Sequence, residues 1–147
     1  MISISCADYA FPLLPRERRF ALLRLLGFDY VDLGLFERSE EAPDQAGLGI
    51  FPGAVKRFDQ SARVPHMGWN QLDLVRPSKL LKGLPPRPHV YFAHSYYVPV
   101  VDQTAATCSY AATYTAVLES GNVFGVQCHP EKSGPLGLAM VRNFVEF

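Results

Sequence analysis

His129 and Glu131 are the residues of this sequence whose types and spacing most directly suggest chemistry. They lie two positions apart after a short apolar stretch, residues 123–127, and Pro130 restricts the backbone between them. In an extended segment, side chains two residues apart project to the same side, so we expect the imidazole and the carboxylate to be neighbours. A carboxylate that fixes the tautomer of an imidazole is the base-and-orienter part of a nucleophilic triad. The third member of such a triad is a thiol or a hydroxyl.

The sequence has three cysteines that could be this nucleophile, Cys6, Cys108 and Cys128. Cys6 ends a predicted strand, and no helix N-terminus is expected beside its thiol to activate it. Cys128 adjoins His129, but neighbouring strand residues face opposite sides, so we expect its thiol in the core. Cys108 falls in a strand with no partner indicated. We predict that none of the three is a nucleophile and that they form neither a disulfide framework nor a zinc site.

Composition and charge exclude several classes of function. The 147 residues are 48% hydrophobic and 12% aromatic, which is enough for a packed core. Fourteen basic and fourteen acidic residues give a formal charge of zero, so binding to nucleic acid or to an anionic membrane has no electrostatic support. No apolar stretch reaches the length of a membrane span, and the first residues lack the pattern of a signal peptide. We therefore expect a cytoplasmic protein that binds neither nucleic acid nor a membrane.

Residues 1–38 are predicted to form a strand–helix–strand unit. Strands are expected at Ile2–Cys6 and Tyr30–Phe36, with a helix over residues 15–27 that starts with proline and ends with glycine. Such a βαβ unit brings its two strands together in parallel. The polar residues 39–46, which include a proline, are predicted to be a linker.

Residues 47–147 are predicted to form a sheet with several antiparallel strands and a terminal helix, so the chain as a whole has an α/β fold. We expect strands at Val55–Phe58, Val90–Val98, Thr104–Ser109, Thr113–Leu118 and Val123–Gln127. The dipeptide Gly121-Asn122 favours a tight hairpin turn before the last strand. Ser133 is suited to cap the terminal helix, with Pro135 in its first turn. Four apolar residues at helical spacing should face the core: Leu136, Met140, Phe144 and Phe147.

The other histidines have structural interpretations. We expect His66 and His94 to donate hydrogen bonds to backbone carbonyls, and His89, in a proline-rich stretch, to be solvated. Trp69 would belong to a core or an interface in any fold, because large aromatic side chains dominate both.

Four motifs in chain order resemble one protein family. They are GLGIFPG at residues 47–53, VPHMGWN at 64–70, YFAHSYY at 91–97 and GNVFGVQCHPEKSG at 121–134. The HPE triplet is shared by class I glutamine amidotransferases in general. PHMGWN and HSYY narrow the resemblance to the glutamine amidotransferase subunit of imidazole glycerol phosphate synthase. The resemblance therefore implies the carboxy-terminal half of an amidotransferase sheet.

This resemblance implies a protein that hydrolyses glutamine and passes ammonia to a (βα)8-barrel cyclase subunit in histidine biosynthesis. No metal or organic cofactor is implied. The resemblance assigns roles to seven residues: His129 as general base, Glu131 as its orienter, Ser95 and Tyr96 beside the glutamine pocket, and Met67, Trp69 and Asn70 towards the cyclase, with Trp69 near the ammonia passage.

The sequence departs from that family in its first part. The family's nucleophile is a cysteine in a G-x-C-x-G elbow that follows an oxyanion loop, and the sequence contains neither element. Met1–Phe36 instead resembles the first βαβ unit of sugar-phosphate isomerase/epimerase barrels related to xylose isomerase, through ISISCADYAF and LLGFDYVDLGLF. One unit of eight cannot close a barrel, and the metal-binding carboxylates of that family have no room here.

Three hypotheses about function follow. The first is a glutaminase subunit of the synthase that is inactive alone because its nucleophile is missing. The second is a non-catalytic chimeric fragment that binds a partner at most. The third, ranked last, is a sugar-phosphate isomerase, for which the sequence offers no set of metal ligands.

Overall fold

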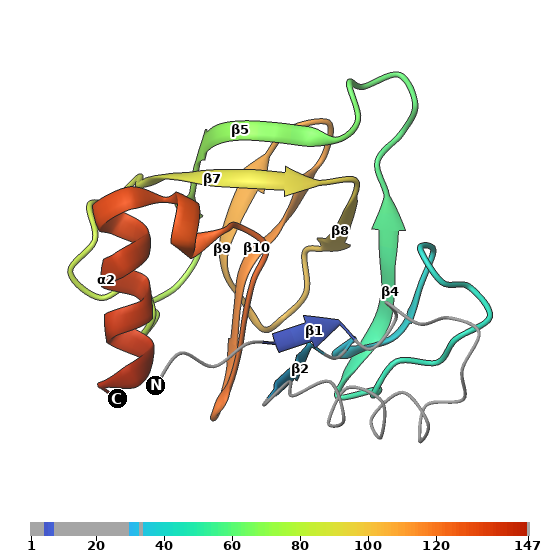
Figure 1. Cartoon of the computed structure of the whole chain (residues 1–147), viewed down its shortest axis with the longest axis horizontal. Coiled ribbons are helices and arrows are strands. Elements are labelled where there is room, and N and C mark those ends of the chain that lie inside the picture. Colours follow the sequence, from blue (N-terminus) through green and yellow to red (C-terminus); the bar gives the residue numbers. More distant parts are fainter. Residues whose placement is uncertain (1–4, 8–29, 33, 147) are drawn as a thin grey trace. The chain divides into compact units, whose positions relative to one another are not determined.

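The computed structural model describes residues 34–146, together with the backbone of residues 5–7 and 30–32. The chain divides into two compact units, Met1–Ala54 and Val55–Phe147. Strands dominate the described residues and a helix closes the chain (Figure 1). The predicted α/β class is therefore confirmed. None of the helices in the described part of the chain has the length and apolarity that crossing a membrane requires.

The first unit contains a short parallel strand pair. β1 (Ser5–Ala7) and β2 (Tyr30–Asp32) run in parallel, with Ser5 opposite Tyr30. This pairing agrees with the parallel arrangement expected for two strands in this part of the chain. The helix predicted over residues 15–27 lies outside the described residues, so the complete βαβ unit stays a prediction.

The segment predicted to be a linker forms turns within the first unit. β3 (Phe36–Ser39) leads into these turns, and β4 (Phe51–Arg57) follows them as the neighbour of β3 in the sheet. Gly47 N–H donates to the Glu37 carbonyl at 2.8 Å. A Cβ on Gly47 would lie 1.7 Å from the Phe36 carbonyl oxygen, so only glycine fits this close return of the chain. The strand predicted at Val55–Phe58 is β4, which begins four residues earlier, at Phe51, and ends one residue earlier, at Arg57.

The second unit is organised around β10 (Thr113–Ser120). β9 (Thr104–Ser109) pairs antiparallel with β10, and β6 (Asp73–Leu74) pairs with the far side of β9. β8 (Tyr96–Pro99) pairs with the start of β10, and β11 (Val123–Val126) pairs with its end. The last residues of β4 pair with β8. Figure 1 shows β9 and β10 side by side.

The hairpin between β10 and β11 confirms the prediction made from Gly121-Asn122. Ser120 lies opposite Val123, so the loop has two residues. Gly121 has a φ of +61°, a conformation that glycine adopts without the steric penalty of a side chain. The turn delivers the chain through β11 to His129.

A second two-stranded sheet consists of β5 (His66–Gln71) and β7 (His89–His94). The prediction of one strand at Val90–Val98 is wrong, because the chain changes sheets at Ser95 and continues as β8. The Ser95 carbonyl accepts a hydrogen bond from Phe58 N–H at 3.1 Å instead of joining either ladder. Aromatic residues, which favour strands, occur both before and after Ser95, so composition alone predicted one continuous strand.

The core of the second unit lies between these sheets and the terminal helix. Its largest fully buried side chains include Tyr114, Phe92, Leu72 and Met140. The 3-10 helix η2 (Pro130–Lys132) leads into α2 (Gly134–Val145). The predicted apolar stripe of α2 is only partly right, because Met140 is buried but Phe144 is 53% exposed. Phe147 lies outside the described residues.

Candidate functional site

The His129–Glu131 pair is formed. His129 Nδ1 lies 2.8 Å from Glu131 Oε1, and the two side chains are 38% and 64% exposed. His129 is extended, with φ −97° and ψ 95°, whereas Glu131 is already in η2. The pair is therefore made across the start of a 3-10 turn, and the expectation of an extended segment through Glu131 is wrong. With Nδ1–H donating to the carboxylate, Nε2 is the atom that can accept a proton.

The electrostatics of Glu131 fit the role of an orienter. Burial pushes the pKa of the Glu131 carboxyl upwards, but the hydrogen bond with His129, backbone hydrogen bonding and the nearby charges of His129 and Lys132 lower it below its ordinary value. The carboxyl is therefore ionised at neutral pH and acts as an acceptor for the imidazole N–H.

The backbone of Tyr91, in the middle of β7, holds the loop that carries the pair. His129 N–H donates to the Tyr91 carbonyl at 2.8 Å, and Tyr91 N–H donates to Ser133 Oγ at 2.9 Å. The Ser133 hydroxyl in turn donates to the His129 carbonyl at 2.7 Å. Ser133 is 1% exposed. It occupies the N-cap position of α2 as predicted, but its side chain makes no cap hydrogen bond and bridges the loop to β7 instead.

An exposed aromatic face adjoins the pair. Trp69 on β5 lies opposite Tyr91 on β7, with their rings 6.1 Å apart and nearly perpendicular. The Tyr91 ring is 6.4 Å from that of His129, and Lys132 Nζ lies 5.6 Å from the Tyr91 centroid. Trp69 and Met67 are 57% and 64% exposed. The face that carries these two predicted interface residues is therefore continuous with the His129 site.

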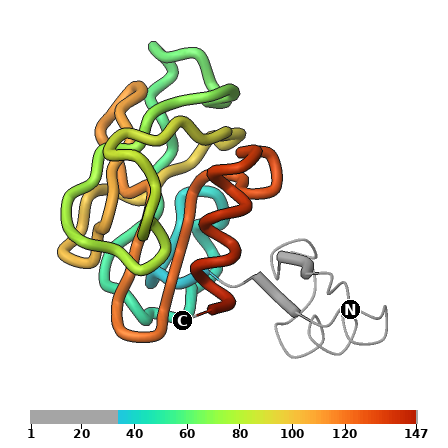
Figure 2. Tube along the Cα trace, turned by 90° about the vertical axis from the view of Figure 1, so that its left-hand side faces the viewer, coloured from blue at the N-terminus to red at the C-terminus, as the bar shows by residue number. Residues whose placement is uncertain are grey.

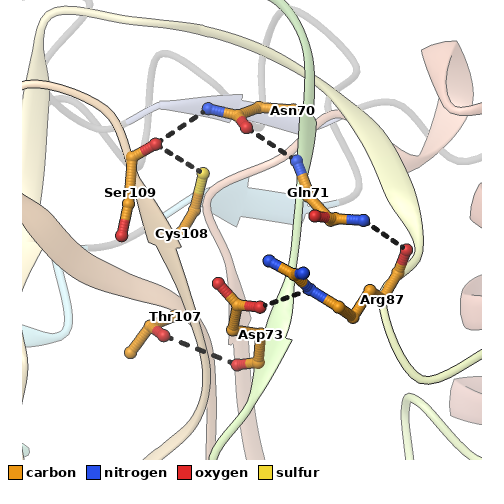
Figure 3. Close-up of polar contacts among 7 residues, drawn as sticks. All are labelled: Asn70, Gln71, Asp73, Arg87, Thr107, Cys108 and Ser109. Carbon is orange, nitrogen blue, oxygen red and sulfur yellow. Dashed lines mark hydrogen bonds and ion pairs between the residues drawn. The ribbon is translucent and has the colours of Figure 1, made fainter.

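Asn70 does not share this face, although the sequence grouped it with Met67 and Trp69. Its neighbours in β5 alternate between the two sides of the ribbon, and its Nδ2 donates to the Ser109 carbonyl at 3.0 Å (Figure 3). Its Oδ1 accepts from Gln71 N–H at 2.8 Å. The contact with Ser109 joins β5 to the end of β9, and the assignment of Asn70 to the partner interface stays a prediction.

Ser95 and Tyr96, predicted to lie beside a glutamine pocket, sit at the corner between β7 and β8. The Tyr96 carbonyl accepts from His94 Nδ1 at 2.8 Å, and Tyr96 pairs with Arg57 of β4. None of the hydrogen bonds found for these two residues reaches His129. Their role in substrate binding stays a prediction.

His66, His94 and Tyr114 form a polar cluster in which His66 and Tyr114 are buried and His94 is half-buried. His66 Nδ1 lies 3.2 Å from His94 Nε2, and the Tyr114 hydroxyl lies 3.2 Å from each of these two atoms. Because His94 Nδ1 donates to the Tyr96 carbonyl, its Nε2 is the acceptor. The prediction for His94 is confirmed. His66 differs from its prediction, because its ring nitrogens meet side chains, including that of Asn70 at 3.4 Å, and no carbonyl.

Burial keeps both imidazoles of this cluster neutral. Burial lowers the pKa of His66, and it lowers the pKa of His94 to about 4. For His94, the hydrogen bond to the Tyr96 carbonyl opposes this shift, and electrostatic interactions with the His66 and His129 rings add to it. Burial also raises the pKa of the Tyr114 hydroxyl. The cluster is therefore uncharged at neutral pH, and its side chains hydrogen-bond to one another within the core.

The thiols of Cys108 and Cys128 are inert. Both residues are buried, and burial disfavours their thiolate forms. It raises the pKa of the Cys108 thiol, and it raises the pKa of the Cys128 thiol to about 12. Cys128 belongs to the core cluster, as its position next to His129 predicted. The side chain of Cys6 lies outside what the structure describes. Within the described residues, no group of three or more His, Cys, Asp or Glu side chains is placed to hold a metal ion.

Comparison with known proteins decides the family. The family model described as "Glutamine amidotransferase class-I" matches residues 44–147. The chain belongs to this family. Within the amidotransferase chain, the match contains the His129–Glu131 pair and the exposed face of β5 and β7.

Within this family, the chain is similar to curated proteins that share one name. The amidotransferase chain is 52% identical over 118 residues to "Imidazole glycerol phosphate synthase subunit HisH" of Microcystis aeruginosa, covering 76% of this chain and 55% of that protein. It is 45% identical over 112 residues to the protein of the same name from Desulfitobacterium hafniense, covering 75% and 53%. The corresponding protein of Xanthomonas campestris is 48% identical over 114 residues, covering 76% and 56%. The chain therefore spans about half the length of the curated relatives it matches.

A solved structure supports the fold. The crystal structure of a putative GMP synthase protein from Thermoplasma acidophilum matches with a TM-score of 0.56 and 16% sequence identity. The match covers 99% of this chain and 94% of that chain.

Proposed function

We propose that this amidotransferase chain is the base-bearing part of a glutaminase that supplies ammonia to a cyclase subunit for histidine biosynthesis in the cytoplasm. The observation that carries the proposal is the 2.8 Å contact between His129 Nδ1 and Glu131 Oε1, which leaves Nε2 open to accept a proton. The relatives named as synthase subunits support this specific reaction.

The chemistry assigned to the pair is proton transfer. His129 Nε2 takes the proton of a cysteine thiol, and the sulfur attacks the carboxamide carbon of glutamine. The C–N bond then breaks, ammonia leaves with the proton from the imidazolium, and water hydrolyses the thioester to glutamate. Glu131 holds the imidazole in the required tautomer and stabilises the imidazolium.

The described residues do not supply the thiol for this reaction. Cys108 and Cys128 are buried and protonated, because burial disfavours the thiolate. We therefore propose that the chain alone has no glutaminase activity. The test is ammonia release from glutamine by the purified chain, with and without a cyclase subunit. We expect none in either case, and turnover that is abolished by Cys6→Ser would refute this.

The exposed face formed by Met67, Trp69 and Tyr91 is the surface that we assign to the cyclase. It is apolar, exposed and continuous with the His129 site, as a surface next to an ammonia exit would be. Calorimetry of the chain with a cyclase subunit should show association, and Trp69→Ala should weaken it by about 2 kcal/mol or more if Trp69 is an anchor. Leu138→Ala is the matched control, because Leu138 is similarly exposed, at 61%, but lies on α2. Absence of any association would rule out this assignment.

If the chain neither releases ammonia nor associates with a cyclase subunit, the remaining hypothesis is the non-catalytic fragment. The third hypothesis, a sugar-phosphate isomerase, rests on residues 1–36, and nothing in the comparisons supports it. We do not propose it.

A further inference from the structure

The imidazole of His129 is both exposed and oriented. Its Nδ1–H donates to Glu131 Oε1 at 2.8 Å, so Nε2 is the nitrogen that carries the lone pair of the neutral ring. The His129 side chain is 38% exposed, which lets a small molecule approach it. Histidine forms covalent intermediates in its own right, so a lone pair presented in this way is a nucleophile as well as a proton acceptor.

A closed ring of three hydrogen bonds holds the backbone of His129. His129 N–H donates to the Tyr91 carbonyl, Tyr91 N–H donates to Ser133 Oγ, and the Ser133 hydroxyl donates to the His129 carbonyl, at 2.8, 2.9 and 2.7 Å. The loop that carries His129 connects the β10–β11 hairpin, in orange in Figure 2, to α2, in red. A reacting group that is fixed before the substrate arrives loses little further conformational freedom in the reaction.

The charges around His129 suit attack by Nε2 on an ester carbonyl. Attack makes the imidazole ring positive, and the Glu131 carboxylate at 2.8 Å stabilises that charge. The carbonyl oxygen becomes negative at the same time. Lys132 Nζ lies 5.6 Å from the centroid of the Tyr91 ring, which is itself 6.4 Å from the His129 ring, so a cation on the same face favours the oxyanion.

We propose that His129 Nε2 is itself a nucleophile, and that this chain hydrolyses activated aryl esters of short carboxylic acids. Nε2 forms a bond to the ester carbonyl carbon, and the C–O bond to the aryl group breaks to release the aryl oxide anion. Water then attacks the acyl-imidazolium, which releases the carboxylate and a proton and restores the neutral ring. Because imidazole displaces only weakly basic leaving groups, aryl esters with electron-withdrawing substituents react, whereas alkyl esters and amides do not. The activity shares the His129–Glu131 pair with the proposed function but needs neither a cysteine thiol nor a cyclase subunit.

The probe is para-nitrophenyl acetate, mixed with the full chain while the release of nitrophenolate is followed by its absorbance. We expect a rate about tenfold above that of N-acetylhistidine amide at the same concentration, because the ring is fixed and paired. His129→Asn should lower the rate about tenfold, and Glu131→Gln about fivefold, because a neutral amide stabilises the imidazolium less well than a carboxylate.

Two variants are the matched controls. His89→Asn removes another exposed histidine, at the start of β7, and should leave the rate unchanged. Cys6→Ser removes the thiol whose position lies outside the described residues, and it should leave the rate unchanged as well. Circular dichroism checks that each variant is folded.

Three results would overturn the inference. They are a rate no higher than that of the model compound, a rate that a folded His129→Asn variant retains, and a loss of activity in Cys6→Ser. The first turnover should proceed equally fast in D2O and in water, because nitrogen attack transfers no proton; a slower first turnover in D2O would show that His129 removes a proton from water and would overturn the acyl step. The ester assay uses neither glutamine nor a cyclase subunit, so its failure is distinguishable from failure of the proposed function.

Discussion

Acid should destabilise the second unit through His66 and His94 before the carboxylates of this unit are protonated. His94 has an ordinary pKa of 6.5, and in the folded chain its pKa is about 4. The unfolded chain therefore binds more protons than the folded chain between these values, and stability is lost as pH falls through this window. His66 acts in the same direction, because its pKa is lowered as well.

The size of the effect follows from the two pKa values. Linkage for one group with these values gives a loss of about 2 kcal/mol between pH 7.5 and pH 5. His94 is only partly buried, so solvent screening reduces this to about 1 kcal/mol. Glu131 and Asp59 have lowered pKa values in the folded chain, so their contributions to stability are lost only as the pH falls below their ordinary pKa values of 4.5 and 3.8. The range above pH 5 therefore isolates the histidines.

The assay is urea unfolding monitored by circular dichroism at pH 7.5, 6.5, 5.8 and 5.0. His94→Asn keeps an N–H that can donate to the Tyr96 carbonyl but removes the titrating ring. We expect this variant to be less stable at pH 7.5 and to lose less stability on acidification than the original chain. His89→Asn is the control, because it replaces an exposed histidine at the start of the same strand, β7. A pH dependence that is identical with and without His94 would refute the reasoning.

Three further predictions concern the loop that carries the candidate base. Ser133→Ala should lower the free energy of unfolding in urea by about 2 kcal/mol, because it leaves the partly buried Tyr91 N–H and the His129 carbonyl without the hydroxyl that they share. Gly137→Ala should destabilise the chain by about 2 kcal/mol, because the added Cβ would lie 1.9 Å from the Pro130 carbonyl oxygen. This cost outweighs the better helix propensity of alanine. A variant of equal or higher stability would contradict the close packing of α2 on η2. Glu131→Gln should reduce the fraction of His129 in the Nδ1–H tautomer, measured by ¹⁵N NMR, and an unchanged tautomer ratio would remove Glu131 from the role of orienter.

Local sequence signals predicted the part of the fold that depends on neighbours in the chain. β9 has the predicted bounds, Thr104–Ser109, and the hairpin at Gly121 forms as expected. The pairing of His129 with Glu131 and the burial of Cys128 also followed from spacing. In each of these cases the determining residues lie within a few positions of one another.

Features that depend on distant partners were missed. β5 was not predicted, because its pairing with β7 joins His66 to His94 across 28 residues and Gly68 interrupts its pattern. The bridge that Ser133 makes to Tyr91 spans 42 residues, whereas the local sequence indicated only a helix cap. A serine hydroxyl serves either purpose equally well, and only the packing of η2 on β7 selects between them.

The position of β10 has a consequence for how the second unit opens. One side of this strand is occupied by β9, and the other side is shared by β8 and β11. Separating it from the sheet breaks hydrogen bonds to three neighbours at once, so its amides should exchange with solvent only in global unfolding. The strand that leads to the candidate base is attached to the last segment of the unit to come apart, which keeps His129 in place during smaller local fluctuations.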